Sequence, residues 1–433
     1  MARLAITGGT VLTMDPGDRI LAPGFVLVEE SALAQVGGGD PSPAQLEGAE
    51  VLDASGCVVM PGLVNAHTHV AMTLMRGYAD DMPVQEWLEQ KIWPLESHLQ
   101  PDDVYWGSLL GMAEMLLGGT TCFNDMYHFF EATARAIVDS GIRGCPSGVL
   151  LGIVPWARQM LADAKHFVAD WKGAGEGRVH PFFGPHALYT CPDELLLEVA
   201  EAARDLRVPM HVHLAETEAH RQRAFEAYGK SPVQHLASLG LLDQPVLAAH
   251  CVWVDEQDIA ALAAKQTGVS LNVGSNLKLG SGVPPIEALL AAGVRVGLGT
   301  DGAASNNNLS MLEETRLAAL VAKGANRRPE ALPAYEALKL ATLGGARALG
   351  LEALIGSREA GKQADLVVVS MEAAHLLPVH NAVSHLAYSA MDSDIRDVFV
   401  AGRALVRNRQ LLTIDLGEVH GKVEESLGRL LSS

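Results

Sequence analysis

Four short segments of the chain each carry a side chain that can bind a metal ion, and each follows an apolar, strand-like run. The runs cover residues 57–64, 208–212, 246–249 and 294–298, and the side chains after them are His67, His69, His213, Glu216, His250 and Asp301. A hydrolytic zinc site needs nitrogen and oxygen ligands and one open position for water. Segments this far apart can share one site only in a fold that brings several strand ends together.

The middle of the chain, residues 61–362, alternates between strand and helix patterns. Strands are expected at 58–66, 120–125, 144–150, 180–184, 209–214, 246–250, 269–273 and 294–299, with helical patterns such as 131–139, 192–205, 232–240, 256–265 and 285–292 between them. This pattern predicts an α/β fold, a TIM-like (β/α)8 barrel of parallel strands. A doubly wound open sheet is the alternative. The barrel explains the ligands better, because the ends of strands 1, 5, 6 and 8 converge only when the sheet closes.

Both ends of the chain show the sequence pattern of short β-strands separated by turns. Residues 1–60 read as short strands with Gly, Asp and Pro turns, and residues 365–369 and 398–406 are strand-like, with a hairpin turn expected at Ala401-Gly402. We expect residues 1–60 and 363–433 to form one composite β-sandwich domain that ends in a helix at 416–431. The catalytic barrel is then residues 61–362.

Composition limits the partners. The 433 residues carry a formal charge of −19, and only 19% of them are charged against 48% that are hydrophobic. Nucleic acids and anionic membranes require basic patches, so we expect neither partner and predict a small-molecule substrate. The five cysteines form no Cys-x-x-Cys pair, and neither a signal peptide nor an apolar run of about 18 residues is found. We therefore expect a cytoplasmic protein, and a homo-oligomer.

The spacing of the histidines supports a metal site. His67 and His69 are two residues apart, which on a strand places both imidazoles on one side. His211 and His213 repeat this spacing; His213 stands at the strand end and is the predicted ligand, whereas His211 lies deeper as a core or supporting residue. No lysine ends a predicted strand, so a two-metal site bridged by a modified lysine is not expected. The sequence predicts one metal ion.

For three candidate residues, a purely structural role has to be weighed against a role in the site. Glu216 could be a solvated carboxylate that caps the next helix, and His250 could be a core histidine with its hydrogen bonds satisfied. Asp301 follows a run of small residues at a strand end, where a carboxylate is rarely structural. With Asp301 among the ligands, Glu216 and His250 are left as candidates for moving protons.

Two segments resemble the amidohydrolase superfamily: Pro61–His69, its first-strand signature, and Gly361–Val368, its return into the terminal sheet. The similarity covers nearly the whole chain. More narrowly, the chain resembles the family of 5′-methylthioadenosine/S-adenosylhomocysteine deaminases in segments 76–88, 93–96, 184–186, 275–278 and 299–308. Part of this narrower pattern is shared with guanine, triazine and other ring deaminases.

The resemblance implies a role for each candidate. One divalent metal, Zn2+ or in some relatives Fe2+, would be held by His67, His69, His213 and Asp301. Asp301 would also take the proton of the attacking water, His250 would orient that water, and Glu216 would protonate the ring nitrogen. Glu96, which without the family reads as an exposed helix residue, would accept hydrogen bonds from the ribose diol. His186 would contact the purine.

The chain departs from the pattern of this family at one point that affects the choice of substrate. Relatives that accept the homocysteine tail need a cation for its carboxylate, and the arginines near the third barrel strand are Arg143 and Arg158. Neither has an assured position, which favours 5′-methylthioadenosine, with its neutral apolar tail, over S-adenosylhomocysteine; adenosine stays a possible substrate. Two alternatives stay open: a deaminase or dechlorinase of a free heterocycle such as guanine or an s-triazine, and a barrel that serves as a scaffold without catalysis.

Overall fold

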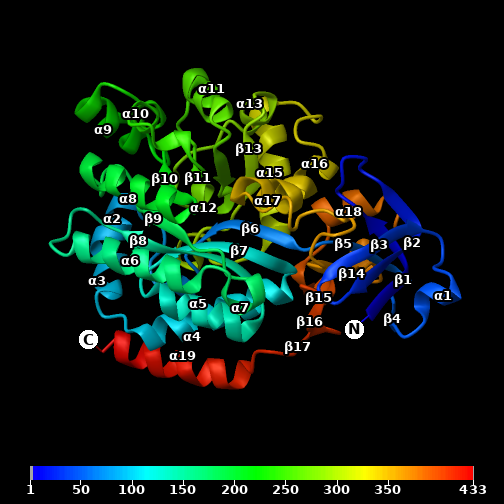
Figure 1. Cartoon of the computed structure of the whole chain (residues 1–433). Coiled ribbons are helices and arrows are strands. Elements are labelled where there is room, and N and C mark those ends of the chain that lie inside the picture. Colours follow the sequence, from blue (N-terminus) through cyan, green and yellow to red (C-terminus); the bar gives the residue numbers. More distant parts are fainter. Residues whose placement is uncertain (1–2, 433) are drawn as a thin grey trace.

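The computed structural model describes residues 3–432, which form two sheets surrounded by helices (Figure 1). One sheet has eight strands that pair in parallel in chain order: β6 (Leu63–Thr68), β7 (Thr120–Tyr127), β8 (Arg143–Leu150), β9 (Phe182–Pro185), β10 (Met210–Leu214), β11 (Val246–His250), β12 (Gly268–Leu271) and β13 (Arg295–Leu298). This is the barrel that the alternating pattern predicts, and the open doubly wound sheet is excluded.

The barrel closes between its first and last strands. β13 and β6 lie in contact, and just beyond β13 the amide of Asp301 donates to the carbonyl of His67 at 2.9 Å. The buried side chain of Asn65 adds two hydrogen bonds to Thr300, from its Nδ2 to Oγ1 at 2.7 Å and from the Thr300 amide to its Oδ1 at 3.0 Å. These bonds fix the carboxyl end of β13 against that of β6.

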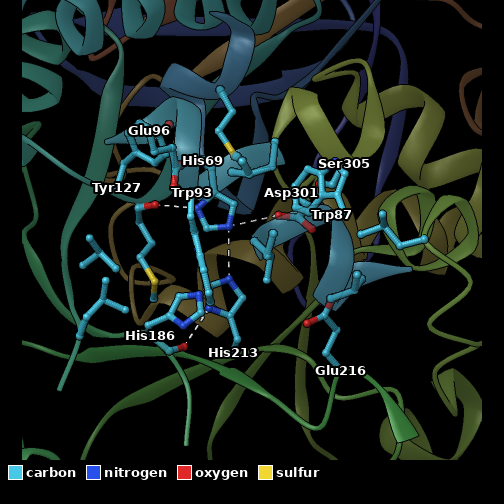
Figure 2. A pocket seen from close by; sticks show the side chains of 18 of the residues that line it. His69, Trp87, Trp93, Glu96, Tyr127, His186, His213, Glu216, Asp301 and Ser305 are labelled. Atoms are coloured by element: carbon cyan, nitrogen blue, oxygen red, sulfur yellow. Dashed lines mark hydrogen bonds and ion pairs between the residues drawn. The ribbon is translucent and has the colours of Figure 1, made fainter. Parts of the chain in front are cut away.

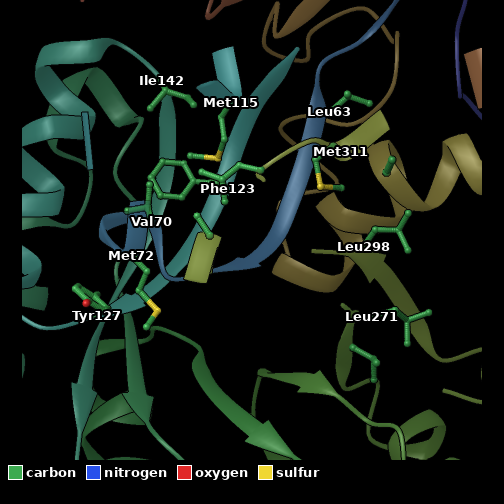
Figure 3. Packing of buried hydrophobic residues seen from close by; sticks show 14 of the residues in the cluster. Leu63, Val70, Met72, Met115, Phe123, Tyr127, Ile142, Leu271, Leu298 and Met311 are labelled. Atoms are coloured by element: carbon green, nitrogen blue, oxygen red, sulfur yellow. The ribbon is translucent and has the colours of Figure 1, made fainter. Parts of the chain in front are cut away.

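Helices follow the strands around the outside of the barrel (Figure 1). The main ones are α4 (Pro101–Leu117), α5 (Phe130–Ser140), α6 (Ala157–Trp171), α8 (Asp193–Leu206), α9 (Glu218–Tyr228), α10 (Pro232–Ser238), α11 (Glu256–Ala264), α13 (Ile286–Ala291), α15 (Met311–Asn326), α16 (Ala334–Lys339) and α17 (Gly345–Leu349). Several begin at a side-chain cap, for example Ser231 before α10 and Asp255 before α11. Aliphatic and aromatic side chains fill the space between strands and helices, as Figure 3 shows for residues such as Phe123, Met115 and Leu298.

The second sheet combines both ends of the chain, in blue and orange-red in Figure 1. It has nine strands in the order β17 (Gln410–Leu411), β16 (Arg403–Arg407), β15 (Ile395–Val400), β14 (Leu366–Ser370), β5 (Cys57–Pro61), β1 (Arg3–Leu12), β2 (Ile20–Glu29), β3 (Ala32–Gly38), with β4 (Glu50–Asp53) paired to β1. β15 and β16 pair antiparallel around Ala401 and Gly402, whose φ angles are 48° and 74°. This is the predicted hairpin turn.

The first barrel strand differs from its prediction. The apolar run 57–64 reads as one strand, but the structure divides it: β5 pairs with β14 in the terminal sheet, and only β6 belongs to the barrel. The break falls at Gly62, where a Cβ atom would lie 2.0 Å from Oγ1 of Thr121. The side chain of Thr121 therefore packs against the backbone of Gly62 in the space that any other side chain would need, at the point where one sheet ends and the other starts.

A buried ion pair ties the barrel to the terminal sheet. Arg143 at the start of β8 donates from Nε and Nη2 to the carboxylate of Asp365 at 2.8 and 3.0 Å, and both side chains are 2% exposed. Asp365 also accepts from the amide of Ala401 at 2.7 Å. The C-terminal helix α19 (Leu416–Leu430) packs along α4 on the barrel (Figure 1). The division into domains at residues 60 and 362 stays a prediction.

Short helices cover the carboxyl ends of the barrel strands. After β6 the chain forms η1 (Val70–Met75), α2 (Val84–Trp87), the π-turn η2 (Leu88–Ile92) and α3 (Trp93–Glu96), while α12 (Val273–Lys278) and α14 (Ala303–Asn306) follow β12 and β13. All of these segments except α12 contribute residues to the wall of the site described next, and α12 packs behind it. Within residues 3–432, no helix is long and apolar enough to cross a membrane.

Candidate active site

The structure brings the four predicted ligands together at the carboxyl end of the barrel. His67 and His69 come from the end of β6, His213 from β10 and Asp301 from the residues after β13. Nε2 of His67 and Nε2 of His69 each lie 3.3 Å from Oδ1 of Asp301, and Nε2 of His213 lies 3.2 Å from Nε2 of His69. Ligand atoms of His67, His250 and Asp301 also lie within 4.8 Å of one another, so His250 stands beside the four predicted ligands. His67 and His69 face the same carboxylate oxygen, as their two-residue spacing on a strand predicts.

The opposite ring nitrogen of each histidine is held by a neighbouring group. Nδ1 of His69 lies 2.6 Å from the carbonyl of Met126, and Nδ1 of His213 lies 2.9 Å from the carbonyl of His186. Because a carbonyl only accepts, both Nδ1 atoms carry a proton and both Nε2 atoms present a lone pair. Nδ1 of His67 lies 2.7 Å from Nε2 of the buried His211, so His211 is the supporting residue that the sequence allowed.

The residues fit a metal ion. With their Nδ1 protons fixed, His69 and His213 direct lone pairs at each other across 3.2 Å, an arrangement that repels unless a cation lies between them. Nε2 of His67 is buried and makes no hydrogen bond within residues 3–432. Separations of 3.2–3.3 Å between these atoms are short enough for them to share one metal ion at ligand distances of about 2.1 Å. Burial also lowers the pKa of His67 to about 4 and that of His213 well below its usual value, which keeps these imidazoles neutral.

Asp301 is held in a conformation that few aspartates adopt. Its φ is 63°, in the left-handed region, and its backbone and side chain are both fixed: the amide donates to His67, and Oδ2 accepts from the Ser275 hydroxyl at 2.6 Å. Burial alone raises the pKa of this carboxyl, but the ring nitrogens of His67, His250 and His69 hold it well below its ordinary value. The carboxylate is therefore ionised and ready to bind a cation.

His250 is a positioned residue of the site and not a core histidine. It ends β11 with φ 76°, is 1% exposed and lines the same pocket as Asp301. Its Nδ1 lies 3.3 Å from Nδ2 of Asn272 and closer, at 2.9 Å, to Oδ1 of Asn276 on α12. Donation from Nδ1 to that oxygen leaves Nε2 of His250 as an acceptor facing the pocket.

Glu216 is buried in the pocket and does not cap the next helix. Thr217 is the N-cap of α9, where its hydroxyl accepts from the amide of His220, and Glu216 is 8% exposed. Burial raises the pKa of Glu216. A buried carboxyl with a raised pKa, standing across from the ligand set, can donate a proton to a substrate.

The pocket extends from the ligands to the helices that follow β6 (Figure 2). Its empty volume is about 740 Å3, part of it open to solvent, and its apolar lining includes Trp87, Trp93 and Leu151. Glu96 also lines it, with a side chain 10% exposed, so the exposed-helix reading of Glu96 is wrong. Oε2 of Glu96 lies 3.8 Å from Nε2 of His128.

His186 lines the pocket from the end of β9. Its Nδ1 lies 2.9 Å from Oγ1 of Thr190, and burial lowers the pKa of its ring to about 3. The ring is therefore neutral, as a partner for a neutral heterocycle must be. The hydroxyl of Thr190 itself donates to the carbonyl of Ala187 at 3.1 Å, so Nδ1 of His186 serves as the donor to Thr190 and Nε2 is left as an acceptor.

The structure also shows residues that the sequence did not assign. Tyr127, His128, Trp87 and Trp93 line the pocket, but no spacing rule marks them, because β7 and the helices after β6 gain their position from tertiary packing. Asn276 lies in a segment, 275–278, that the resemblance had marked without giving it a role.

A parallel barrel with three histidines and an aspartate at its carboxyl end defines the class of metal-dependent hydrolases. The Amidohydrolase family matches residues 58–405, and the chain belongs to that family. The chain is 44% identical over 432 residues to the 5-methylthioadenosine/S-adenosylhomocysteine deaminase of Pelotomaculum thermopropionicum, covering 100% of both chains. It is also 44% identical over 436 residues to the 5′-deoxyadenosine deaminase of Methanosarcina mazei, covering 100% of this chain and 99% of that one.

Solved structures agree with this assignment. An adenosine deaminase from Xanthomonas campestris with bound zinc superposes with a TM-score of 0.95 at 36% identity, covering 100% of this chain and 99% of that one. An atrazine chlorohydrolase from Arthrobacter aurescens, complexed with zinc, gives a TM-score of 0.91 at 26% identity, covering 98% and 100%. The family accounts for the metal-dependent hydrolase chemistry that the ligand set indicates, and the scaffold reading is excluded.

Proposed function

We propose that this chain is a metal-dependent aminohydrolase that converts an adenine nucleoside, preferably 5′-methylthioadenosine, and water to the inosine analogue and ammonia. One observation carries the proposal: a single pocket joins the ligand set to two carboxylates, the buried Glu216 near the ligands and the largely buried Glu96 on α3. The relatives of 44% identity support the adenine nucleoside as the substrate class.

The metal-binding residues in this proposal are His67, His69, His213 and Asp301. A divalent ion there, Zn2+ in first place and Fe2+ as the alternative, supplies the Lewis acidity that lets water attack near neutral pH. Asp301 accepts the proton of the attacking water, since its carboxylate is ionised. His250 orients the water through Nε2, because Asn276 engages Nδ1 of the same ring.

Glu216 supplies the acid. Water attacks the carbon that bears the amino group, and a proton from Glu216 on the adjacent ring nitrogen removes electron density from that carbon. The carbon–oxygen bond forms first; the carbon–nitrogen bond then breaks as the proton held by Asp301 moves to the leaving amine. Ammonia departs as the hydroxyl on that carbon becomes a carbonyl, and the hydroxyl proton replaces the one that Glu216 gave to the ring nitrogen. The ring is then that of the inosine analogue, and both carboxyl groups are back in their starting states.

Glu96 and His186 bind the nucleoside away from the reacting carbon. A carboxylate has two acceptor oxygens, which suits the paired hydroxyls of a ribose. The neutral His186 ring contacts the purine, with Nε2 available as an acceptor. Trp87 and Trp93 supply apolar surface along the same pocket wall.

The preference for a neutral tail rests on the charges of the pocket. Among the described residues that line it, none is a lysine or an arginine. Arg143 is buried against Asp365, away from the pocket, and Arg158 is exposed on α6. The thiomethyl group of 5′-methylthioadenosine needs no cation, whereas the carboxylate of S-adenosylhomocysteine does, and adenosine would leave the apolar surface uncovered.

A free heterocycle, guanine or an s-triazine, is the second candidate. Its supporting observation is the fold similarity to the atrazine chlorohydrolase, at 26% identity. The position of Glu96 favours the nucleoside, since a free base offers no diol to a carboxylate that is largely withdrawn from water.

An ammonia-release screen tests the proposal. Purified, metal-loaded enzyme is mixed in turn with 5′-methylthioadenosine, S-adenosylhomocysteine, adenosine, guanine and cytosine, and loss of the adenine absorbance band follows the first three directly. We expect the highest kcat/KM for 5′-methylthioadenosine. Ammonia release from guanine alone would instead support the free-heterocycle reading. The homo-oligomer stays a prediction, which light scattering on the same preparation tests.

A further inference from the structure

A buried carboxylate outside the pocket connects two of the segments that hold the site. Glu314 lies on α15, is 1% exposed and faces the short helices α12 and α14. It accepts from the amide of Gly274 at 3.0 and 3.2 Å, through both oxygens, and from Nδ2 of Asn306 at 2.9 Å. All these partners are uncharged donors, and neither Glu216 nor the metal ligands touch this carboxylate.

The carboxylate fits these two segments closely. A Cβ atom on Gly274 would lie 2.3 Å from Oε1 of Glu314 and 2.6 Å from Oδ1 of Asn306, so the backbone of α12 is packed directly against both side chains. Asn306 also donates to the carbonyl of Thr300 at 2.8 Å. Through one amide and one side chain, Glu314 is connected to the residue before Asp301.

The next two residues of α12 contact the reacting groups themselves. The hydroxyl of Ser275 donates to Oδ2 of Asp301 at 2.6 Å, and Oδ1 of Asn276 lies 2.9 Å from Nδ1 of His250. A shift of α12 would therefore move the partners of both residues that handle the attacking water. Asp301 and His250 both have positive φ angles, so their conformations depend on such outside contacts.

We propose that Glu314 is a positioning residue: it fixes α12 against the loop of Asp301, so that Ser275 and Asn276 set the orientation of Asp301 and His250. The inference rests on the proposed function for its kinetic consequences. Burial without a counter-ion raises the pKa of Glu314 to about 8, while the hydrogen bonds from Gly274 and Asn306 act in the opposite direction.

The test compares three variants in the metal-loaded full chain. Glu314→Ala removes both acceptor oxygens, and Glu314→Gln keeps one oxygen in nearly the same shape. Thr315→Val is the matched control, because Thr315 is also buried on α15 but its hydroxyl bonds only to the carbonyl of Met311 in the same helix. Misplacement of catalytic groups by about 1 Å can cost on the order of 100-fold. We expect Glu314→Ala to lose roughly 10–100-fold in kcat with KM changed less than about threefold.

The conservative variants separate positioning from general stability. Glu314→Gln should stay within about fivefold of the wild-type kcat, since an acceptor for Gly274 remains. Thr315→Val should lower the unfolding temperature without lowering kcat measured well below that temperature. Loss of metal to a chelator gives a readout apart from activity: Glu314→Ala should release the ion roughly 10-fold faster than the wild type, and Thr315→Val should not.

A double-mutant cycle with Ser275→Ala tests the route of the effect. If Glu314 acts through α12, the kcat losses of Glu314→Ala and Ser275→Ala are not additive in the double variant. Additive losses, or a Glu314→Ala enzyme with wild-type kcat and metal retention, would overturn the proposal.

Should Glu314→Ala fail to fold, Asn306→Ala replaces it, with an expected kcat loss of roughly 3–10-fold at constant KM. An unchanged kcat in Asn306→Ala contradicts the inference. A wild-type enzyme that releases no ammonia from any adenine nucleoside contradicts the proposed function instead, and the metal-release comparison then judges Glu314 separately.

Discussion

Glu96 gives the sharpest distinction between a nucleoside and a free heterocycle as substrate. Its side chain is 10% exposed and lines the pocket on the wall that carries Trp93, so a bound ribose would exchange hydrogen bonds with a carboxylate partly withdrawn from water. Replacement by alanine removes both acceptor oxygens. The change should weaken binding of the diol in the ground state and the transition state, and it should leave contacts with the heterocycle intact.

The size of the effect follows from the chemistry of the contact. A hydrogen bond to a charged group contributes about 1.5–3 kcal/mol, and the two ribose hydroxyls give about 3–6 kcal/mol. Each tenfold in rate corresponds to about 1.4 kcal/mol, so kcat/KM for 5′-methylthioadenosine should fall roughly 10²–10⁴-fold in Glu96→Ala. The free bases lack the diol, and their turnover should change less than about threefold.

The assay follows adenine absorbance and ammonia release for nucleoside and free base in parallel. Glu86→Ala is the control, because Glu86 is an exposed carboxylate on α2, close to Glu96 in sequence, and its loss should leave both rates unchanged. Glu96→Gln should give an intermediate loss, since one acceptor oxygen remains. If Glu96→Ala leaves nucleoside turnover intact, or lowers nucleoside and free-base turnover equally, the assignment of Glu96 to the ribose is refuted.

Three further predictions concern the metal, the proton donor and the junction of the two sheets. His211→Ala removes the partner of His67 Nδ1 and should weaken metal affinity about 10–100-fold in a chelator competition; unchanged affinity would show that His211 merely fills space. Because burial raises the pKa of Glu216, its protonated form persists above the usual glutamate range and is lost as pH rises further, so kcat/KM should decline on the alkaline side. Glu216→Gln should lose about 10²–10⁴-fold and should also lose that decline, whereas an identical alkaline profile would argue for another acid. Arg143→Met leaves the buried carboxylate of Asp365 without its partner and should cost about 3–5 kcal/mol in denaturant unfolding; a change below about 1 kcal/mol would mean that the pair does not join the sheets.

The grouping of the four proposed ligands could be predicted from the sequence because two independent periodicities agree. The two-residue spacing of His67 and His69 fixes their common side on a strand, and the strand–helix alternation places His213 and Asp301 at the same end of a closed sheet. Each residue lies at a strand end, and both the local residue spacing and the order of the strands predict that position.

The division between β5 and β6 could not be predicted in the same way. Residues 57–64 form a continuous apolar run, and the partner that claims its first half is β14, about 300 residues later in the chain. Only the close approach of Thr121 to Gly62 marks the break, and that approach exists only after the barrel has formed.

The roles of the remaining residues depend on their burial, which the sequence alone does not show. Glu96 and Glu216 read as solvated carboxylates in isolation, since glutamates on short helices and loops are mostly exposed. Each becomes a site residue because the segments after β6 and β10 fold over the barrel mouth. Glu314 gives no local signal at all: its partners, Gly274 and Asn306, belong to separate loops that meet only in the folded structure.

The most direct test of the account combines metal analysis with turnover of 5′-methylthioadenosine. The chain as purified, or after reconstitution with Zn2+ or Fe2+, should hold about one equivalent of metal and release one ammonia for each adenine ring lost, and removal of the metal should abolish the reaction reversibly. A chain that binds less than about half an equivalent, with no gain on reconstitution, or a fully loaded chain that leaves 5′-methylthioadenosine and the other adenine nucleosides unchanged, would contradict it.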